Sequence, residues 1–224
     1  MGHLYLVRHG QASLGAADYD VLSELGRKQS LRLGQWFASR GIAFDAVITG
    51  SLKRHAQTWA QIAAGAGYAS TDCLSWPGLN EYDSEAVIGA IHPQPLQRPD
   101  TPELYREHFR LLRRGLSAWM AAETAPVGMP SYVGFLHGVT SALDHVRQHH
   151  QGKNVLIVSS GGPISTAVGH VLGTTPDTTI ELNLRIRNSA LTEFVFNPKR
   201  HSLLSFNHLP HLDEDAYRDW ISYA

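Results

Sequence analysis

The chain has 224 residues, of which 43% are hydrophobic and 17% are charged, and its formal net charge is -1 at pH 7. This length suits one domain, residues 1–224, with a substantial core. The near-neutral charge excludes a bulk attraction to nucleic acid or to anionic lipid, so any anion site must be local. The single cysteine, Cys73, excludes an intrachain disulfide.

No apolar run of the sequence approaches the length that crosses a membrane. The first residues also contain no basic segment followed by a long apolar one, as a secretory signal would. We therefore expect a cytoplasmic protein with neither a membrane nor a nucleic-acid partner. The oligomeric state is left open by the sequence.

The first predicted strand is the short apolar run at residues 4–7. It ends on Arg8, His9 and Gly10, and a glycine there allows a sharp turn and the close approach of a ligand. A strand that ends on a cation and an imidazole has the form of an anion site with a nucleophile in it. From these residues alone, a buried histidine beside a surface arginine is an equally good interpretation.

The next elements are a helix, a short strand and a second helix. Ser23 is the expected N-cap of the first helix, and Gly41 is its expected end. A strand is expected at residues 46–48. The second helix follows Ser51 and carries Arg54 in its first turn.

Arg54 is of interest because a cation at a helix N-terminus is unfavourable against the helix dipole unless an anion is bound there too. Its position therefore supports a phosphate site. The competing interpretation is a solvated arginine beside Lys53, and it is the better one when this residue is taken alone.

A loop at residues 65–77, with at most a short edge strand, leads to Glu81. The segment 84–151 differs from the rest, because prolines between residues 93 and 102 mark irregular connections and two helices follow at about 103–122 and 131–150. We interpret it as a helical insertion that covers one side of the site. The first of these helices carries core candidates at helical spacing, namely Tyr105, Phe109, Leu112, Leu116 and Trp119.

The clearest buried strand is at residues 155–158, and it is followed by Ser160, Gly161 and a helix. Two more strands are expected between residues 188 and 206, around a turn at 197–200. Strands that alternate with helices favour an α/β three-layer sandwich with a mostly parallel sheet and helices on both faces. Ligands bind such sheets at the carboxyl ends of the strands, where His9 and Ser160 are predicted to lie.

Four motifs, in the same order along the chain, resemble those of the histidine phosphatase superfamily, the phosphoglycerate-mutase-like proteins. They are Arg8-His9-Gly10, the stretch around Arg54, the loop around Glu81, and the strand and glycines at 155–163. The resemblance implies a phosphomonoester hydrolase that needs no metal and no cofactor. In it, His9 becomes a phosphohistidine and Glu81 protonates the leaving alkoxide. Arg8 and Arg54 suit the phosphate oxygens as planar, bidentate donors.

The chain departs from this family at one position. The motif after the strand usually reads Ser-His-Gly-Gly, and its histidine contacts the transferring phosphoryl group, whereas this chain has Ser160. The Ser160 hydroxyl and the Gly161 N–H remain as expected phosphate donors. Loss of one charge-stabilising donor can cost about 100- to 1,000-fold in rate. We therefore expect a working but modified site, with activity lowered by Ser160.

Two other functions remain open. Ser160 favours a pseudo-phosphatase that binds a phosphorylated ligand or protein without turnover. Phosphoglycerate-mutase-type transfer is less favoured, because that motif continues as Glu-Ser-x-Trp-Asn and this chain has Gln11, Ala12 and Ser13. The expected substrate is a small phosphorylated metabolite or a phosphoprotein. His145 and His149 have a metal-binding spacing, but with no third ligand indicated we expect a solvated helix end.

Overall fold

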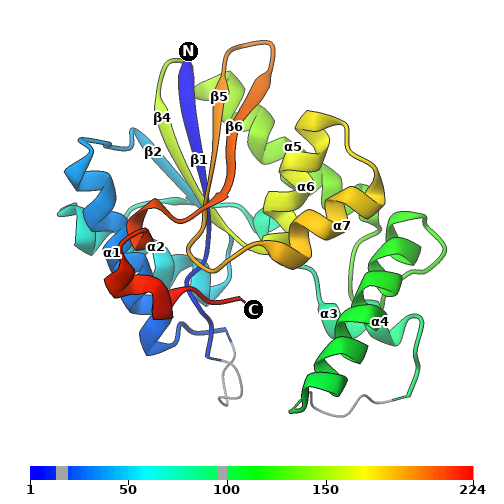
Figure 1. Cartoon of the computed structure of the whole chain (residues 1–224). Helices are drawn as coiled ribbons and strands as arrows, with labels where there is room; N and C mark the ends of the chain where they lie inside the picture. Colours follow the sequence, from blue (N-terminus) through cyan, green and yellow to red (C-terminus); the bar gives the residue numbers. More distant parts are fainter. Residues whose placement is uncertain (14–19, 95–99, 224) are drawn as a thin grey trace.

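A six-stranded sheet with the order β3-β2-β4-β1-β5-β6 forms the centre of the molecule (Figure 1). The structure is a computed structural model that describes residues 1–13, 20–94 and 100–223. Parts of the loop expected near residues 12–20 and of the proline-rich connection at 93–102 lie outside the described residues. The strands are β1 (Gly2–Arg8), β2 (Ala46–Thr49), β3 (Leu74–Ser75), β4 (Asn154–Ser159), β5 (Leu191–Phe196) and β6 (His201–His208).

The sheet is parallel from β3 to β1 and antiparallel beyond it. β1 pairs with β4, β4 with β2 and β2 with β3 in parallel, whereas β5 and β6 are antiparallel additions at the other side of β1. Parallel pairing brings the carboxyl ends of β1 and β4 to the same edge of the sheet. That edge is where the predicted site residues follow their strands.

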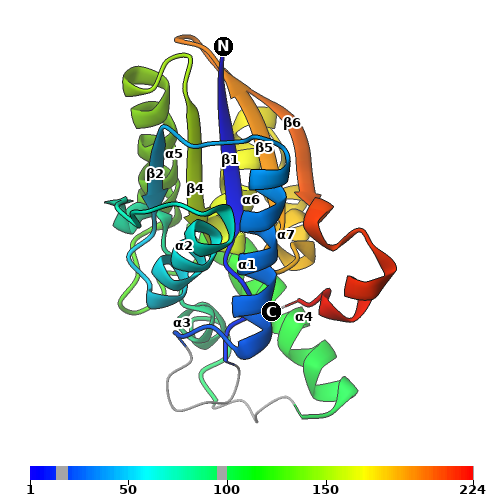
Figure 2. The same ribbon diagram turned by 90° about the vertical axis from the view of Figure 1, so that its left-hand side faces the viewer.

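Helices cover both faces of the sheet. α1 and α2 lie on one face, and α5 and α6 lie on the other (Figure 2). The described helices are α1 (Glu24–Ser39), α2 (Lys53–Ala66), α3 (Ser84–Gly89), α4 (Pro102–Met120), α5 (Tyr132–His149), α6 (Gly161–Leu172) and α7 (Pro176–Arg185), with short 3-10 helices η1 (Pro77–Leu79), η2 (Pro210–Leu212) and η3 (Asp215–Trp220).

The two faces of β1 belong to two apolar clusters, because successive side chains of a strand point to opposite sides. Tyr5 and Val7 pack in the cluster that includes α1 and α2. Leu4 and Leu6 pack in the larger cluster with α4, α5 and α6. Because both faces of β1 are buried, its sequence is a continuous apolar run instead of an alternation of apolar and polar residues. The predicted fold class, a mostly parallel sheet with helices on both faces, is confirmed.

The segment 84–151 contains α3, α4 and α5, and these helices differ in their relation to the sheet. α5 belongs to the layer on the sheet, where Val139 and Val146 are fully buried. α3 and α4 extend beyond the sheet (Figure 1). No helix within the described ranges is both long and apolar enough to cross a membrane.

The prediction that Tyr105 and Phe109 on α4 belong to the core is wrong. Tyr105 is 41% exposed and Phe109 is 38% exposed, whereas Leu112, Leu116 and Trp119 are buried as expected. The apolar spacing continues along α4, but the buried residues of this helix in the described structure begin at Leu111. Helical periodicity identifies the apolar face of a helix, but it does not show how much of that face other elements bury.

α1 and α2 pack in close backbone contact through glycines. A Cβ at Gly34 would lie 2.1 Å from the carbonyl oxygen of Ile62, and one at Gly65 would lie 2.1 Å from that of Leu31. Real Cβ atoms do not approach this closely, so the two helices could not keep this spacing with larger residues. The contact matters for the site because α2 carries Arg54 in its first turn.

We expect Gly65→Ala to lower the free energy of unfolding by about 1 to 3 kcal/mol, because the added methyl group must push α2 away from α1. Gly89→Ala is the matched control, because a Cβ there meets nothing within 4 Å. It should stabilise the protein by about 0.4 to 1 kcal/mol through a less flexible unfolded chain. Urea denaturation measures both. Equal stabilities of the two variants would contradict the close packing.

Candidate active site

The pairing of β1 with β4 places His9 beside Ser160. Arg8 lies opposite Ser159 in the parallel register, and the backbone N–H of His9 donates to the carbonyl of Ser159 at 2.9 Å. The next residues along each strand are therefore His9 and Ser160. Their exposed fractions are 3% and 0%. Two sequence-predicted site residues thus meet at the carboxyl edge of the sheet.

His9 is held as a neutral ring with a defined tautomer. Burial, and then the positive charges of Arg8 and Arg54, lower the pKa of His9 well below its usual range. Its Nδ1 lies 2.7 Å from the carbonyl oxygen of Gly10, which can only accept a hydrogen bond. The proton of the neutral ring is therefore on Nδ1, and Nε2 carries a lone pair.

Arg54 reaches the same point from α2. Its Nε donates to Nε2 of His9 at 3.2 Å, and its Nη1 forms a 2.8 Å ion pair with Asp20. The guanidinium is largely buried, with the residue only 8% exposed. The structure therefore places Arg54 in the cluster with His9, and the interpretation of a freely solvated arginine is wrong.

Arg8 is also buried, with an exposed fraction of 6%. Its Nη1 donates to the carbonyl oxygen of Ile186, in the turn after α7. Together with Arg54 it lowers the pKa of His9, and the two arginines also lower the pKa of Glu81 against the effect of burial. Two guanidiniums are thus brought to one small region, which favours an anion as a ligand.

Glu81 follows η1 and is held near the start of α6. The backbone N–H of Gly162 donates to both carboxyl oxygens, at 3.0 and 3.2 Å. Burial raises the pKa of Glu81 above its usual value, against the lowering effects of this N–H and of the two arginines. The loop is anchored by a 2.7 Å bond from Ser159 Oγ to the Leu79 carbonyl.

Ser160 and Gly161 stand at the start of α6, with Ser160 as the N-cap residue. The Ser160 Oγ lies 2.7 Å from Nε2 of His55. A Cβ at Gly161 would meet the Asn183 side chain at 2.8 Å, so the Cα of Gly161 faces α7. The N–H that contacts Glu81 comes from Gly162, one residue later than the glycine singled out in the sequence.

His55 is the site residue that sequence reasoning missed. It lies next to Arg54 on α2, is fully buried, and its ring centroid is 5.7 Å from that of His9. The only signal in the sequence was its place directly after Arg54. That place by itself does not distinguish a residue aimed at the site from one aimed at the core.

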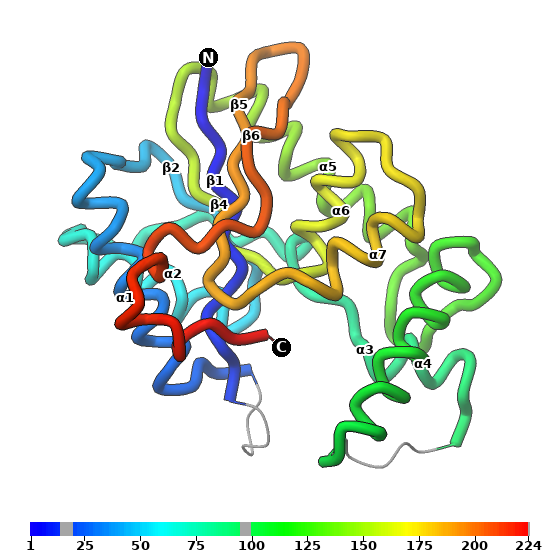
Figure 3. The backbone as a smooth tube through the Cα atoms, viewed as in Figure 1, coloured from blue at the N-terminus to red at the C-terminus, as the bar shows by residue number. Residues whose placement is uncertain are grey.

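A second group that the sequence did not connect with the site holds the backbone of His9. The backbone N–H of Ser189 donates to the carbonyl of His9 at 3.1 Å, and Ser189 Oγ is 2.9 Å from Nε2 of His211. The C-terminal segment returns beside α1 (Figure 3), where Gln29 donates to the carbonyl of Trp220 at 2.6 Å. His211 thus contributes to the backbone setting of the site.

The histidines on α5 lie elsewhere. The rings of His145 and His149 are stacked with centroids 4.4 Å apart near the end of the helix. Within the described ranges, no three histidine, cysteine, aspartate or glutamate side chains come together as a metal site would require.

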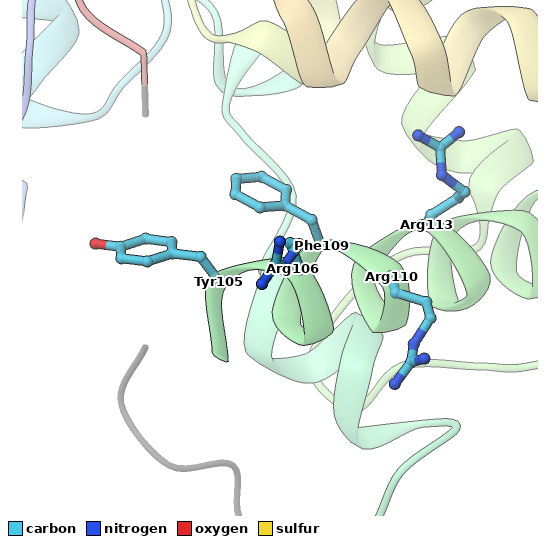
Figure 4. Close-up of a pocket in the computed structure, with 5 residues that line it drawn as sticks. All are labelled: Tyr105, Arg106, Phe109, Arg110 and Arg113. Carbon is cyan, nitrogen blue, oxygen red and sulfur yellow. The ribbon is translucent and has the colours of Figure 1, made fainter. Parts of the chain in front are cut away.

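An open pocket of about 360 Å³ lies along α4. Figure 4 shows that the Tyr105 and Phe109 side chains extend outward from this helix. The lining residues are Tyr105, Arg106, Phe109, Arg110 and Arg113. Each of the three arginines has a carboxylate partner: Glu103, Glu107 and Glu181, respectively. The pocket therefore presents aromatic surface more than uncompensated positive charge.

The chain shares its α/β fold with solved structures of phosphoglycerate-mutase-like proteins. The family model described as "Histidine phosphatase superfamily (branch 1)" matches residues 4–209. The chain belongs to this superfamily, as its motifs indicate.

Solved structures of the same fold include phosphatases and a mutase. A phosphoserine phosphatase from Entamoeba histolytica, in complex with 3-phosphoglyceric acid, is 22% identical with a TM-score of 0.66, covering 95% of this chain and 100% of that one. A phosphoglycerate mutase from Bacillus anthracis str. Sterne is 18% identical with a TM-score of 0.66, covering 93% and 94%. A mycobacterial glucosyl-3-phosphoglycerate phosphatase is 19% identical with a TM-score of 0.62, covering 92% and 98%.

The raised pKa of Glu81 predicts a pH dependence of stability. Because the folded state keeps this carboxyl protonated at a pH where the unfolded chain has released the proton, wild-type stability falls as pH rises through the folded pKa. Glu81→Gln removes this loss. We therefore expect the stability of the variant relative to wild type to increase between pH 4 and pH 8.

Urea denaturation without phosphate, repeated across this pH range, measures the difference. The exposed loop residue Glu123 provides the matched control, Glu123→Gln, which removes a carboxyl group outside the buried cluster. A Glu81→Gln difference that stays flat across this pH range would show that the carboxyl group is not held in its neutral form.

Proposed function

We propose that this protein is a phosphomonoester hydrolase that works through a phosphohistidine at His9, without a metal ion. The observation that carries the proposal is the state of His9. Its proton is committed to the Gly10 carbonyl, and its Nε2 lone pair accepts a hydrogen bond from the Arg54 guanidinium. A neutral imidazole with a lone pair among arginines is suited to attack a phosphoryl group that those arginines bind.

In the first step, Nε2 of His9 attacks phosphorus and the ester P–O bond breaks. Arg8 and Arg54 bind the phosphoryl oxygens and neutralise their charge, so the Arg54 Nε–H moves from Nε2 to the substrate. Glu81, in its protonated form, gives its proton to the departing alkoxide oxygen. A carboxyl group with a raised pKa is suited to this role near neutral pH.

In the second step, the Glu81 carboxylate takes a proton from water, and the water oxygen attacks phosphorus. The N–P bond breaks, which restores the neutral His9 and releases inorganic phosphate. The two steps return every residue to its starting protonation state. They divide one difficult displacement into two, each with charge stabilisation from the same arginines.

The substrate class that we propose is a small phosphorylated metabolite. The names of the structural neighbours support this choice, because they refer to phosphoserine, phosphoglycerate and glucosyl-3-phosphoglycerate. A phosphoprotein has no comparable support.

The first test is His9→Ala. We expect loss of at least about 1,000-fold in phosphate release from p-nitrophenyl phosphate, and loss of acid-labile labelling by a phosphoryl donor, because no other residue replaces the nucleophile. His3→Ala is the control, since His3 is an exposed histidine on the same strand. Full activity of His9→Ala would overturn the mechanism.

The second test separates the acid role of Glu81 from binding. A good leaving group such as p-nitrophenolate departs without a proton, whereas an alkoxide needs one. We therefore expect Glu81→Gln to reduce kcat on alkyl phosphates by roughly 100-fold or more and to reduce p-nitrophenyl phosphate hydrolysis much less. An equal loss on both substrates would assign Glu81 to binding alone.

A binding-only pseudo-phosphatase is the second candidate function, and Ser160 is the observation that favours it. The same assays decide between the two. A protein that binds inorganic phosphate but releases none from a panel of monoesters would be a binding protein, and His9→Ala would then change nothing in turnover.

A further inference from the structure

A buried pair formed by His55 and Ser160 lies beside the proposed nucleophile and has no part in the mechanism above. Both residues are fully buried, and Nε2 of His55 is 2.7 Å from Ser160 Oγ. The His55 ring centroid lies 5.7 Å from that of His9. A hydrogen-bonded histidine and serine at this place can act on whatever His9 binds.

The backbone around His55 leaves room for its ring. A Cβ at Gly50 would lie only 2.2 Å from Nδ1 of His55. Gly50 directly follows β2. Because it has no side chain, the His55 ring can lie against its backbone and reach Ser160. Such a close approach requires glycine, and it indicates that the ring has a fixed position instead of filling space loosely.

His55 is neutral in the folded protein. Burial, and then the neighbouring Arg54 guanidinium, lower the pKa of His55 to about 3. The ring thus offers one N–H and one lone pair near neutral pH. It does not supply a positive charge to the site, so any effect on a phosphoryl group must come from hydrogen bonding.

We propose that His55 is a positioning residue that directs the Ser160 hydroxyl toward the phosphoryl group on His9. Nε2–H of His55 donates to Ser160 Oγ, and the hydroxyl hydrogen is then left to donate to a phosphoryl oxygen. This inference rests on the proposed function, because it assigns a further donor to the same reaction.

The ligand itself selects this arrangement of protons. Phosphoryl oxygens only accept hydrogen bonds, so a Ser160 hydroxyl that gave its hydrogen to His55 would turn a lone pair toward an anion. The opposite ring nitrogen, Nδ1, lies against the Gly50 backbone, which raises the pKa of His55 against the lowering effects of burial and Arg54, but no hydrogen bond of regular geometry forms there in the described part of the chain.

The test compares two variants of similar size. The His55→Gln amide can still donate to Ser160, whereas the His55→Leu side chain fills the space without a donor. We expect His55→Leu to lower kcat by about 100-fold, the cost of one lost transition-state donor, with a smaller change in KM. His55→Gln should keep most of the activity. A purely structural role would make the two variants alike.

A double-mutant cycle shows whether His55 acts through Ser160. Ser160→Ala should lower kcat about as much as His55→Leu does, and the double variant should be no worse than either single one. Losses that add in the double variant would overturn the proposal, as would full activity of His55→Leu. His201→Leu is the control, because it makes the same substitution at a partly buried histidine away from the site. His201 begins β6 and pairs with Phe196 at the end of β5.

Orthovanadate binding, measured by isothermal calorimetry, distinguishes failure of this inference from failure of the proposed function. We expect weaker binding by His55→Leu and Ser160→Ala than by wild type and His55→Gln, since vanadate imitates the transferring group. An active wild type whose vanadate affinity does not depend on His55 would overturn the role of His55 alone. A wild type that neither binds vanadate nor hydrolyses monoesters would overturn both proposals.

Discussion

The parallel pairing of β1 with β4 is the constraint on which the site depends. It fixes Arg8 opposite Ser159, so that the two strands end together and their next residues are His9 and Ser160. A slip of one residue would turn His9 to the other face of the sheet and separate it from Ser160. The fully buried apolar residues of both strands oppose such a slip, because each belongs to the core of one particular face.

Charge is balanced in this site by keeping the histidines neutral. Two buried guanidiniums already lie at the strand ends, and they help to lower the pKa of His9. A protonated ring beside them would add repulsion and would remove the lone pair that a nucleophile needs. Asp20 offsets part of the charge of Arg54 through its 2.8 Å ion pair. A dianionic phosphate is the kind of ligand that two neighbouring guanidiniums bind.

The sequence predicted the layers of the fold from short-range patterns, whereas it grouped His9, Arg54, Glu81 and Ser160 only through the resemblance to a family. Strand ends, the Ser23 cap and the place of Arg54 in a first turn can all be inferred locally. Contacts between distant segments could not be. His55 meets Ser160 across 105 positions of the chain, and the exposure of Tyr105 depends on how far α4 extends beyond its neighbours.

Positions 55 and 160 are best understood as one unit. The small side chain of Ser160 leaves the space that the His55 ring occupies, and the absence of a Cβ at Gly50 lets that ring enter from the other side. An imidazole at position 160 would compete with His55 for this volume, because 2.7 Å separates the present atoms. Serine at position 160 is therefore not a simple loss of a side chain, since the neighbouring element already places an imidazole against it.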